Sequence, residues 1–512
     1  MNKKGRASGI LLHPTSLPGS YGIGDLGAGA YRFVDWLAEQ GQSIWQALPL
    51  GPTSYGDSPY QTLSAFAGNP NLVSLDRLVD DGLLSASDLA DAPPFPAERV
   101  DYGWVIPYHD SLLAKAHRRF RECPDAMLQA AFEQFVARNR YWLEDFALFI
   151  ALKQAHQLRP WPEWESGLRR RDPSTLARAA DEYARDIDRE RFRQWLFHRQ
   201  WSALKAYANR RSIRIFGDLP IFVAHDSADV WARQADYFLD ADGHPTAVAG
   251  VPPDYFSPTG QRWGNPLYRW DVMAADGYRW WLQRLRYLLR LVDSVRIDHF
   301  RGFEAYWRIP AAEPTAINGA WMPGPGHRFF QTILSELGEL PIIAEDLGVI
   351  TPGVEKLRDD FGLPGMKVLQ FAWSDPANPF LPHNHKPNCI VYTGTHDNNT
   401  TRGWWENEVS ADTRGFLEAY LGQAAQDIVW TLARVGMRSS ARACILPMQD
   451  VLGLDESARM NKPGSPDGNW SWRITYADLD NAGKDMLREL TRLYQRHPGQ
   501  QSAVYGDAAT SG

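Results

Sequence analysis

The sequence predicts an α/β protein: a (β/α)8 barrel with a large, mainly helical insertion between strands 2 and 3, an aromatic-rich loop insertion after strand 3, and no separate C-terminal β-domain. Three observations support this fold class. Eight short apolar runs recur along the chain, polar or Gly/Pro-rich sequence follows each of them, and several of the intervening segments have a helical pattern. Short apolar runs bounded by turn signals are typical of buried strands, and strands that alternate with helices favour a parallel barrel.

The individual elements follow from the hydrophobic pattern. The run "SVRID" (294–298) alternates like a strand, and it follows the helix-like stretch "YRWWLQRLRYLLRLV" (278–292). Two more helical patterns lie at 30–42 and 328–339. The eight strands are expected at 9–13, 43–48, 213–218, 294–298, 341–346, 366–373, 389–397 and 441–448.

The uneven spacing of the strands predicts two insertions. The first, 76–200, is too long for a single loop and carries helical patterns. Its segment 169–200 is rich in Arg, but Asp and Glu are interspersed, so we expect a solvated helix face and not a polyanion site. The second insertion, 223–275, is rich in Pro, Gly, Tyr and Trp and should form substrate loops. We therefore expect one catalytic barrel over residues 1–506, and a disordered tail at 507–512.

The composition excludes several functional classes. A net charge of −7 argues against nucleic acid or an anionic membrane as the main partner. No apolar run is long enough for a signal peptide or a membrane span, so we expect a cytoplasmic protein. The odd number of cysteines and the absence of a CxxC pair argue against disulfides and a thiolate zinc site. The cysteines are Cys123, Cys389 and Cys444.

Aromatic residues are unusually frequent, with 21 Trp, 20 Tyr and 22 Phe. Most of them must pack in the core or on the surface, as in any protein. An excess of Trp beside polar loop residues is also typical of a sugar-binding groove, because pyranose rings present apolar C–H faces for stacking.

Acidic residues fall at the ends of four predicted strands, where the chemistry of a (β/α)8 barrel gathers. A ring of carboxylates at one mouth needs either a metal ion or a cationic transition state to offset its repulsion. The candidate metal ligands are His299, His396 and the histidines of 383–385, and their spacing identifies no metal site. We therefore expect no metal and no cofactor. The acidic residues are Asp218, Asp298, Glu345, Asp346 and Asp397.

Glycosidic bond cleavage is the alternative that uses such acids, because it needs one carboxylate as nucleophile or base and a second carboxyl group as general acid. Arg296 lies two positions before Asp298 on one strand, so both side chains point to the same side, and the guanidinium favours the ionised Asp298. Glu345 follows the apolar "PIIA", and partial burial would raise its pKa, as a general acid requires. Asp397 would bind sugar hydroxyls. A buried ion pair with ordinary strand-end acids is the structural alternative.

Several motifs resemble those of a known family. "VRIDHFRGF" (295–303), "IIAEDLG" (342–348) and "YTGTHDNNTTRGWW" (392–405) resemble barrel motifs of the α-amylase superfamily. More specifically, they resemble the 4-α-glucanotransferases of glycoside hydrolase family 77, known as amylomaltases or disproportionating enzymes. Further segments resemble this family in the same order along almost the whole chain. They are the start of the chain and residues 58–75, 217–231, 250–268, 364–373 and 461–473.

The resemblance implies a role for each acid. Asp298 would be the nucleophile, Glu345 the general acid/base and Asp397 the stabiliser of the transition state. Tyr60 would stack on the sugar next to the scissile bond, and Trp263 would cover the acceptor side. The remaining sugar-site residues implied by the resemblance are Asp218, Arg296, which would also keep Asp298 ionised, His299, Phe371 on the donor side, His396 and Asn469.

The implied reaction is a retaining transfer of α-1,4-glucan segments to the 4-hydroxyl of glucose or a maltooligosaccharide, through a covalent β-glycosyl-aspartyl intermediate. Two rivals stay open at this point. An α-1,4-glucan hydrolase would share the same acids, and a non-catalytic glucan-binding protein could share the same barrel. The sequence also leaves open the oligomeric state, for which a monomer or a weak homo-oligomer is expected, and the preferred donor length.

Overall fold

The computed structural model describes most of the 512-residue chain. The tail predicted at 507–512 lies outside the described residues, as do three residues of the 250–268 loop. The described ranges are 5–123, 125–253, 257–465, 467–483 and 485–497.

Eight parallel strands form one sheet, in the order β10–β11–β12–β1–β2–β3–β6–β9. Every strand predicted from the sequence is present, within a few residues of its expected bounds, and the (β/α)8 fold is confirmed. The strands are β1 (Ala7–Leu11), β2 (Ile44–Gln46), β3 (Arg214–Pro220), β6 (Ser294–Asp298), β9 (Ile342–Ala344), β10 (Gly365–Val368), β11 (Cys389–Tyr392) and β12 (Ala443–Pro447).

The sheet closes into a barrel between β9 and β10, and a side chain takes part in the closure. The Ala344 N–H donates to the Pro364 carbonyl at 2.9 Å. One step further, the Met366 N–H donates to Asp346 Oδ1 at 2.6 Å, in place of a backbone carbonyl. The Asp346 carboxylate is buried, and it also accepts a hydrogen bond from Arg358. Asp346 therefore belongs to the seam of the barrel.

Two sets of side chains alternate along the strands. Val295 and Ile297 of β6 belong to the large apolar cluster that packs helices onto the barrel, whereas Met366 and Tyr392 belong to a second cluster. The Tyr392 hydroxyl donates to Gln46 Oε1 at 2.8 Å, although their strands are not neighbours, so this second cluster fills the barrel interior. Since successive side chains on a strand face opposite ways, Arg296 points into that interior.

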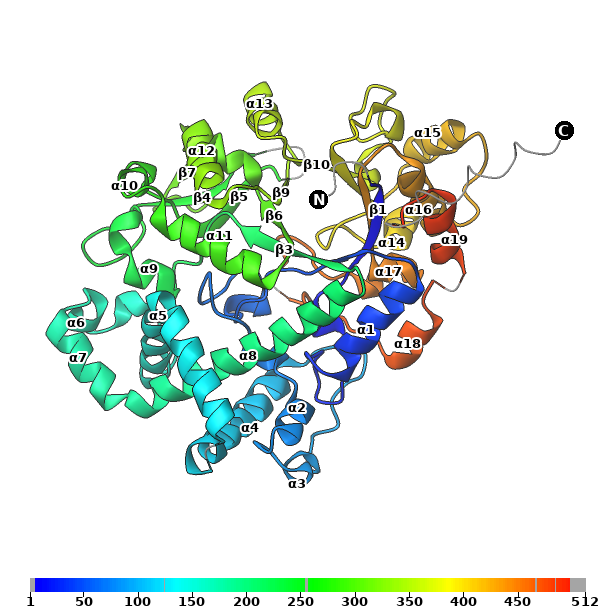
Figure 1. The fold of residues 1–512 in the computed structure, drawn as a ribbon. Helices are drawn as coiled ribbons and strands as arrows, with labels where there is room; N and C mark the ends of the chain where they lie inside the picture. The colour runs from blue at the N-terminus through cyan, green and yellow to red at the C-terminus, as the bar shows by residue number, and fades with distance from the viewer. Residues whose placement is uncertain (1–4, 124, 254–256, 466, 484, 498–512) are drawn as a thin grey trace.

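The first insertion is mainly helical, as predicted. Its helices are α2 (Leu75–Asp80), α3 (Ala86–Leu89), α4 (Tyr102–Glu122), α5 (Ala126–Ala155), α6 (Ser166–Arg169), α7 (Pro173–Glu182) and α8 (Ala184–Arg210). Figure 1 shows α8 continuing from the insertion to the barrel, where it packs between α1 (Ala28–Glu39) and α11 (Arg279–Leu291). Trp201 Nε1 donates to the Leu291 carbonyl at 2.8 Å in this contact. The predicted boundary at 200 thus falls inside one continuous helix, and the existence of a separate helical subdomain stays a prediction.

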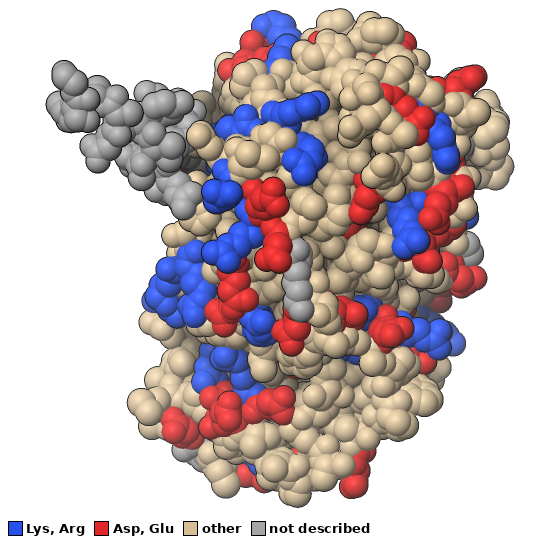
Figure 2. Space-filling model, turned by 90° about the vertical axis from the view of Figure 1, so that its right-hand side faces the viewer, with Lys and Arg blue, Asp and Glu red and all other residues tan. Residues whose placement is uncertain are grey.

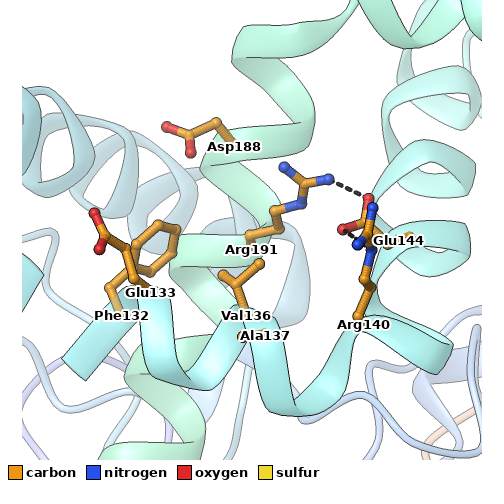
Figure 3. Close-up of a pocket in the computed structure, with 8 residues that line it drawn as sticks. All are labelled: Phe132, Glu133, Val136, Ala137, Arg140, Glu144, Asp188 and Arg191. Atoms are coloured by element: carbon orange, nitrogen blue, oxygen red, sulfur yellow. Dashed lines mark hydrogen bonds and ion pairs between the residues drawn. The ribbon is translucent and has the colours of Figure 1, made fainter. Parts of the chain in front are cut away.

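The arginines of α8 pair with acids from neighbouring helices. Arg193, which is almost fully buried, lies 3.1 Å from Asp110, and Arg199 donates to Asp81 at 2.6 Å. A pocket of about 240 Å³ opens between α5 and α8, and Figure 3 shows Arg191 paired with Glu144 in its wall. The charges around this pocket are therefore largely satisfied within the protein. Its lining residues are Phe132, Glu133, Val136, Ala137, Arg140, Glu144, Asp188 and Arg191.

A second, antiparallel sheet was not predicted. It has the order β5–β4–β7–β8 and is formed by β4 (Ala247–Val251), β5 (Gln261–Pro266), β7 (Ala305–Pro310) and β8 (Ala320–Pro323). The segment 223–275, for which the sequence predicts substrate loops, thus also contains the strands β4 and β5. The register of the β4–β5 pair shifts between Val248 and Gly250, and the other partner of β4, the strand β7, lies beyond β6 in the sequence.

The remaining helices lie outside the first insertion. Three of the predicted helices are present as α1, α11 and α12 (Gly326–Leu337). The others are α9 (Ala228–Ala232), α10 (Trp270–Ala275), α13 (Pro352–Asp360), α14 (Thr401–Asn407), α15 (Ala411–Leu421), α16 (Ile428–Arg438), α17 (Met448–Val451), α18 (Tyr476–Asn481) and α19 (Met486–Leu493).

Among the helices that the structure describes, none combines the length and the apolar character needed to cross a membrane. All three cysteines are free thiols, with Cys389 and Cys444 buried and Cys123 exposed. On the face shown in Figure 2, Lys and Arg alternate with Asp and Glu.

The seam of the barrel yields a stability prediction. Replacing Asp346 with Ala removes the acceptor for Met366 and leaves the buried Arg358 without its buried partner, which we expect to lower the free energy of unfolding by about 3–5 kcal/mol. Asp359→Ala is the matched control, because Asp359 also pairs with Arg358 but is about half exposed, and we expect it to cost less than about 1 kcal/mol. Urea unfolding followed by tryptophan fluorescence measures both. Equal effects of the two substitutions would refute the role of Asp346 in closure.

Candidate active site

A buried guanidinium organises the mouth of the barrel. β3 and β6 pair in parallel, with Asp218 opposite Arg296. Arg296 donates to Asp218 Oδ2 at 2.6 Å and to Asp298 Oδ1 at 2.8 Å. The Arg296 and Asp218 side chains are almost fully buried, whereas about a third of the Asp298 side chain is exposed. The predicted pair of Arg296 and Asp298 is therefore present, and Asp218 is a third member of this charged group.

Asp218 also receives a hydrogen bond from Tyr60. The Tyr60 hydroxyl donates to Asp218 Oδ2 at 2.9 Å, and the Leu219 N–H donates to Asp218 Oδ1 at 2.9 Å. Because no part of the Asp218 side chain is exposed, the structure does not support the expected sugar contact for this residue. Its carboxylate instead holds Arg296 and the Tyr60 ring in place.

Glu345 follows β9 and lies beside Asp298. Its Oε2 accepts the N–H of His299 at 2.7 Å, and its Oε1 accepts the N–H of Leu347 at 3.0 Å. His299 follows Asp298 directly and adopts the left-handed conformation (φ 55°, ψ 50°) that ends β6. These bonds fix the Glu345 carboxyl group next to the residue that follows Asp298.

Burial raises the pKa of both acids, but not equally. Loss of solvation raises the pKa of Asp298 to about 6 and that of Glu345 to about 8. Arg296 opposes both rises, and it contacts Asp298 directly. The pKa of Asp298 therefore lies above its ordinary value, not below it, since one guanidinium does not offset burial and the neighbouring carboxylates. At neutral pH the pair still favours an ionised Asp298 and a protonated Glu345.

Asp397 lies in the loop after β11 and has a different environment. Nearly half of its side chain is exposed, and its Oδ2 lies 3.3 Å from His396 Nε2. The His396 ring stacks on Tyr60 with a centroid distance of 5.2 Å and an interplanar angle of 10°. Burial lowers the pKa of His396, which favours its neutral imidazole. The third predicted acid thus reaches the same mouth with an accessible carboxylate.

The neutral rings of two other histidines line this region. Burial lowers the pKa of His299 to about 3, and its Nε2 has no hydrogen-bond partner. Trp263 of β5 lies edge-on to His299 with a centroid distance of 4.9 Å, which brings the second sheet to the site. His13, after β1, was not singled out from the sequence. Its side chain is buried near His396, and burial lowers its pKa to about 3.

Two residues that were predicted to contact the sugar, Phe371 and Asn469, do not contact the acids. Phe371 lies at the end of a short 3-10 turn, is 40% exposed and packs edge-on to Phe380 at 5.9 Å. The Asn469 amide accepts from the Lys462 N–H at 2.8 Å and donates to the Ser465 carbonyl at 2.9 Å, so it supports its own loop. The donor-side role of Phe371 and the sugar contact of Asn469 stay predictions.

A residue of the same loop that was not predicted reaches an acid. Asn461 Nδ2 donates to Asp397 Oδ1 at 2.6 Å. Asn461 belongs to the "NKPGSPDGNWSWR" stretch (461–473), which holds a second Asn, and nothing in the local pattern distinguishes the two. Only the path of the chain, which brings residues 64 positions apart together, identifies the one that contacts Asp397.

This arrangement of acids and aromatic rings suits reactions at glycosidic bonds. An ionised acid beside a protonated one provides a nucleophile and a general acid, and aromatic rings flank them. Within the described part of the chain, no group of three or more His, Cys, Asp or Glu side chains could hold a metal ion. The fold and the site thus define the class of (β/α)8-barrel enzymes that act on glycosidic bonds.

Comparison with known proteins identifies the family. The model of the 4-alpha-glucanotransferase family matches residues 12–479. A 4-alpha-glucanotransferase from Thermus thermophilus is 52% identical over 500 residues, which cover 96% of this chain and 99% of that protein. One from Synechocystis sp. is 51% identical over 496 residues and covers 96% and 98%. The amylomaltase of Streptococcus agalactiae, solved in complex with acarbose, superposes with a TM-score of 0.92 at 40% identity, covering 96% of this chain and 99% of that one. The chain belongs to the 4-alpha-glucanotransferase family.

Proposed function

We propose that this 4-α-glucanotransferase works by a retaining double displacement in which Asp298 is the nucleophile and Glu345 the general acid/base. The observation that carries the proposal is the unequal environment of the two acids. Arg296 donates directly to Asp298 and favours its anion, whereas burial and the neighbouring Asp298 favour the protonated form of Glu345 over the effect of its two backbone N–H donors. One carboxyl group is thereby favoured as an anion and the other as an acid at neutral pH.

In the first step, a carboxylate oxygen of Asp298 attacks the anomeric carbon of the donor glucan. Arg296 binds Oδ1, which leaves Oδ2 free for the attack. Glu345 transfers its proton to the glycosidic oxygen as the C–O bond breaks, and the released oligosaccharide departs. The product of this step is a β-glycosyl ester of Asp298. We expect the two carboxyl groups to lie roughly 5–5.5 Å apart, the separation of retaining enzymes.

In the second step, the 4-hydroxyl of an acceptor attacks the ester. Glu345, now ionised, takes the hydroxyl proton, and Asp298 leaves as a carboxylate. Two inversions at the anomeric carbon retain the α configuration. The donors would be α-1,4-glucans and maltooligosaccharides, and the acceptors glucose or a maltooligosaccharide, as the names of the relatives suggest.

The surrounding residues bind and position the sugar. Asp397 would hold hydroxyls of the distorted sugar ring, with His396 beside it as a neutral partner. The Tyr60 ring would stack on the sugar next to the scissile bond, and Trp263 would cover the acceptor side against His299. Phe371 would line the donor side, and Asn469 would contact the sugar from its loop. Asp218 acts one layer deeper, as a positioning residue for Arg296 and Tyr60.

Water exclusion separates transfer from hydrolysis, because both share the first step. Family membership supports transfer, and the contact between Trp263 and His299 supports the proposal of an apolar cover over the acceptor side. We further propose the cytoplasm as the location, since free thiols at all three cysteines suit a reducing compartment.

Maltotriose as the sole substrate tests the activity. We expect a ladder of longer maltooligosaccharides together with free glucose, because each transfer lengthens one chain and shortens another. Chromatography of the products with time measures it. Short products without a ladder, with a rising number of reducing ends, would indicate a hydrolase, and unchanged maltotriose would indicate a binding protein.

Substitution of Asp298 with Ala tests the nucleophile. We expect the rate of transfer to fall by a factor of about 10⁴ or more, with maltotriose binding still detectable by calorimetry. Asp412→Ala, which changes an exposed acid on α15, should keep wild-type activity.

Azide rescue makes this test specific for the site of attack. With an α-glycosyl fluoride donor, azide should enter the space left by Asp298→Ala, form a C–N bond as the C–F bond breaks, and yield a β-glycosyl azide. An α-glycosyl azide, or wild-type activity of the variant, would disprove the assignment.

The pH dependence of kcat/KM tests the two roles. Activity should rise as pH increases through about 6, where Asp298 loses its proton, and fall as pH increases through about 8, where Glu345 loses its own. The pKa values obtained from the acidic and alkaline limbs of the profile are apparent values that belong to the two acids together. His13 and His299 do not supply the acidic limb, because burial lowers the pKa of each to about 3.

Glu345→Gln provides the control. With an α-glycosyl fluoride, whose departure needs no general acid, formation of the glycosyl-enzyme should persist in this variant and the alkaline limb should vanish. An alkaline limb that survives the substitution would assign it to another group.

A further inference from the structure

The carboxylate of Asp397 receives little support from its own loop. β11 ends at Tyr392, and residues 393–400 have no regular secondary structure. Within this loop the Asp397 N–H donates to Thr395 Oγ1 at 3.3 Å, and the carboxylate lies near the adjacent His396. A half-exposed acid on such a loop would sample several rotamers, yet stabilisation of a transition state needs a fixed geometry.

A second segment of the chain supplies the missing support. Asn461 Nδ2 donates to Asp397 Oδ1 at 2.6 Å, and the Asn461 N–H donates to the His396 carbonyl at 3.1 Å. Asn461 therefore binds both the side chain of Asp397 and the peptide that precedes it. It fixes Oδ1 and leaves Oδ2 facing the mouth beside His396.

A single guanidinium joins the two segments. Arg459 donates through Nη2 to the Asp397 carbonyl and through Nε to the Asn461 carbonyl, each at 2.8 Å. The planar fork of Arg suits two carbonyls at fixed separation, which an ammonium group does not match. Only 16% of the Arg459 side chain is exposed. Arg459 thus sets the position of Asn461 relative to Asp397.

The outer end of this network is weaker. Arg459 Nη1 lies 3.4 Å from Glu408, which also accepts from Asn399 at 2.9 Å. Nearly half of the Glu408 side chain is exposed, and such an ion pair contributes little. The hydrogen bonds of Arg459 to the two carbonyls carry the connection.

We propose that Arg459 and Asn461 are positioning residues that hold Asp397 in the geometry needed for transition-state stabilisation. The proposal rests on the proposed role of Asp397. Neither residue contacts the other two acids in the described structure, so their effect should appear in the chemical step and not in general sugar binding.

Asn461→Ala tests the contact to the carboxylate. We expect kcat for maltotriose disproportionation to fall about 10–100-fold, KM to change less than about threefold, and the thermal unfolding midpoint to stay within about 2 °C. Asn407→Ala is the matched control. Its amide also reaches the 455–461 segment, at Glu456 Oε2, but it does not touch Asp397. We expect wild-type kcat for this control. An equal loss in both variants would show a structural role only.

Asn461→Asp adds a pH dependence of kcat that a purely structural role of Asn461 would not produce. The new carboxylate would repel Asp397 at neutral pH, whereas its protonated form could donate an O–H in place of the lost N–H. We expect the ratio of its kcat to that of Asn461→Ala to rise as pH falls from 7 to 5. A ratio independent of pH would overturn the proposed hydrogen bond.

Arg459→Lys and Arg459→Ala test the guanidinium. If its fork matters, both variants should lose kcat by a similar factor, because Lys keeps the charge but not the paired donors. Full activity of Arg459→Lys would overturn this part of the proposal.

Asp397→Asn, measured alongside, separates the two proposals. Wild-type activity of that variant would refute the role of Asp397 itself. A large loss there, with wild-type kcat in Asn461→Ala and Arg459→Ala, would refute only the positioning roles.

Discussion

The site depends on one buried cation. Arg296 lies inside the barrel and is hydrogen-bonded to two carboxylates, one fully buried and one at the mouth. Burying a charge is costly unless it is paired, so the guanidinium and Asp218 require each other. Their pairing has two consequences. It fixes the Tyr60 ring through the shared Asp218 oxygen, and it gives Asp298 a counter-charge that Glu345 does not contact.

The barrel makes this arrangement possible through its register. Parallel pairing of β3 with β6 sets Asp218 opposite Arg296, and pairing of β6 with β9 brings the residue after Ala344 to the end of β6. The left-handed turn at His299 then aims its N–H at the Glu345 carboxyl group. The second sheet adds Trp263 from a different direction. Strand register, the turn at His299 and the second sheet thus place their side chains at the same mouth of the barrel.

The sequence predicted those features that depend on the local hydrophobic pattern and on position along a strand. Eight apolar runs identified the barrel, and the strand-end rule together with family motifs identified the acids that the structure brings together. The second sheet escaped because its central pairing, β4 with β7, spans α10, α11 and β6, and because the register of the local β4–β5 pair is irregular. Asn461 and Arg459 escaped for a related reason, since their partner Asp397 is 64 and 62 positions away. Polar contacts between loops depend on tertiary structure, and sequence spacing does not encode them.

The neighbouring acids Glu345 and Asp346 show how the environment assigns roles to similar residues. Burial raises the pKa of both, but successive side chains leave the strand end in opposite directions. Asp346 meets the Arg358 guanidinium and the Met366 N–H in the seam, and both donors favour its anion against the effect of burial. At Glu345, burial and the neighbouring Asp298 outweigh the backbone N–H donors and the field of Arg296, so the protonated form is favoured. The paired carboxyl group of Asp346 serves the fold, and we propose that the titratable Glu345 serves the reaction. Arg358 contacts Asp346 in the seam, whereas no guanidinium contacts Glu345 in the described structure, and this difference separates the structural role of one acid from the proposed catalytic role of the other.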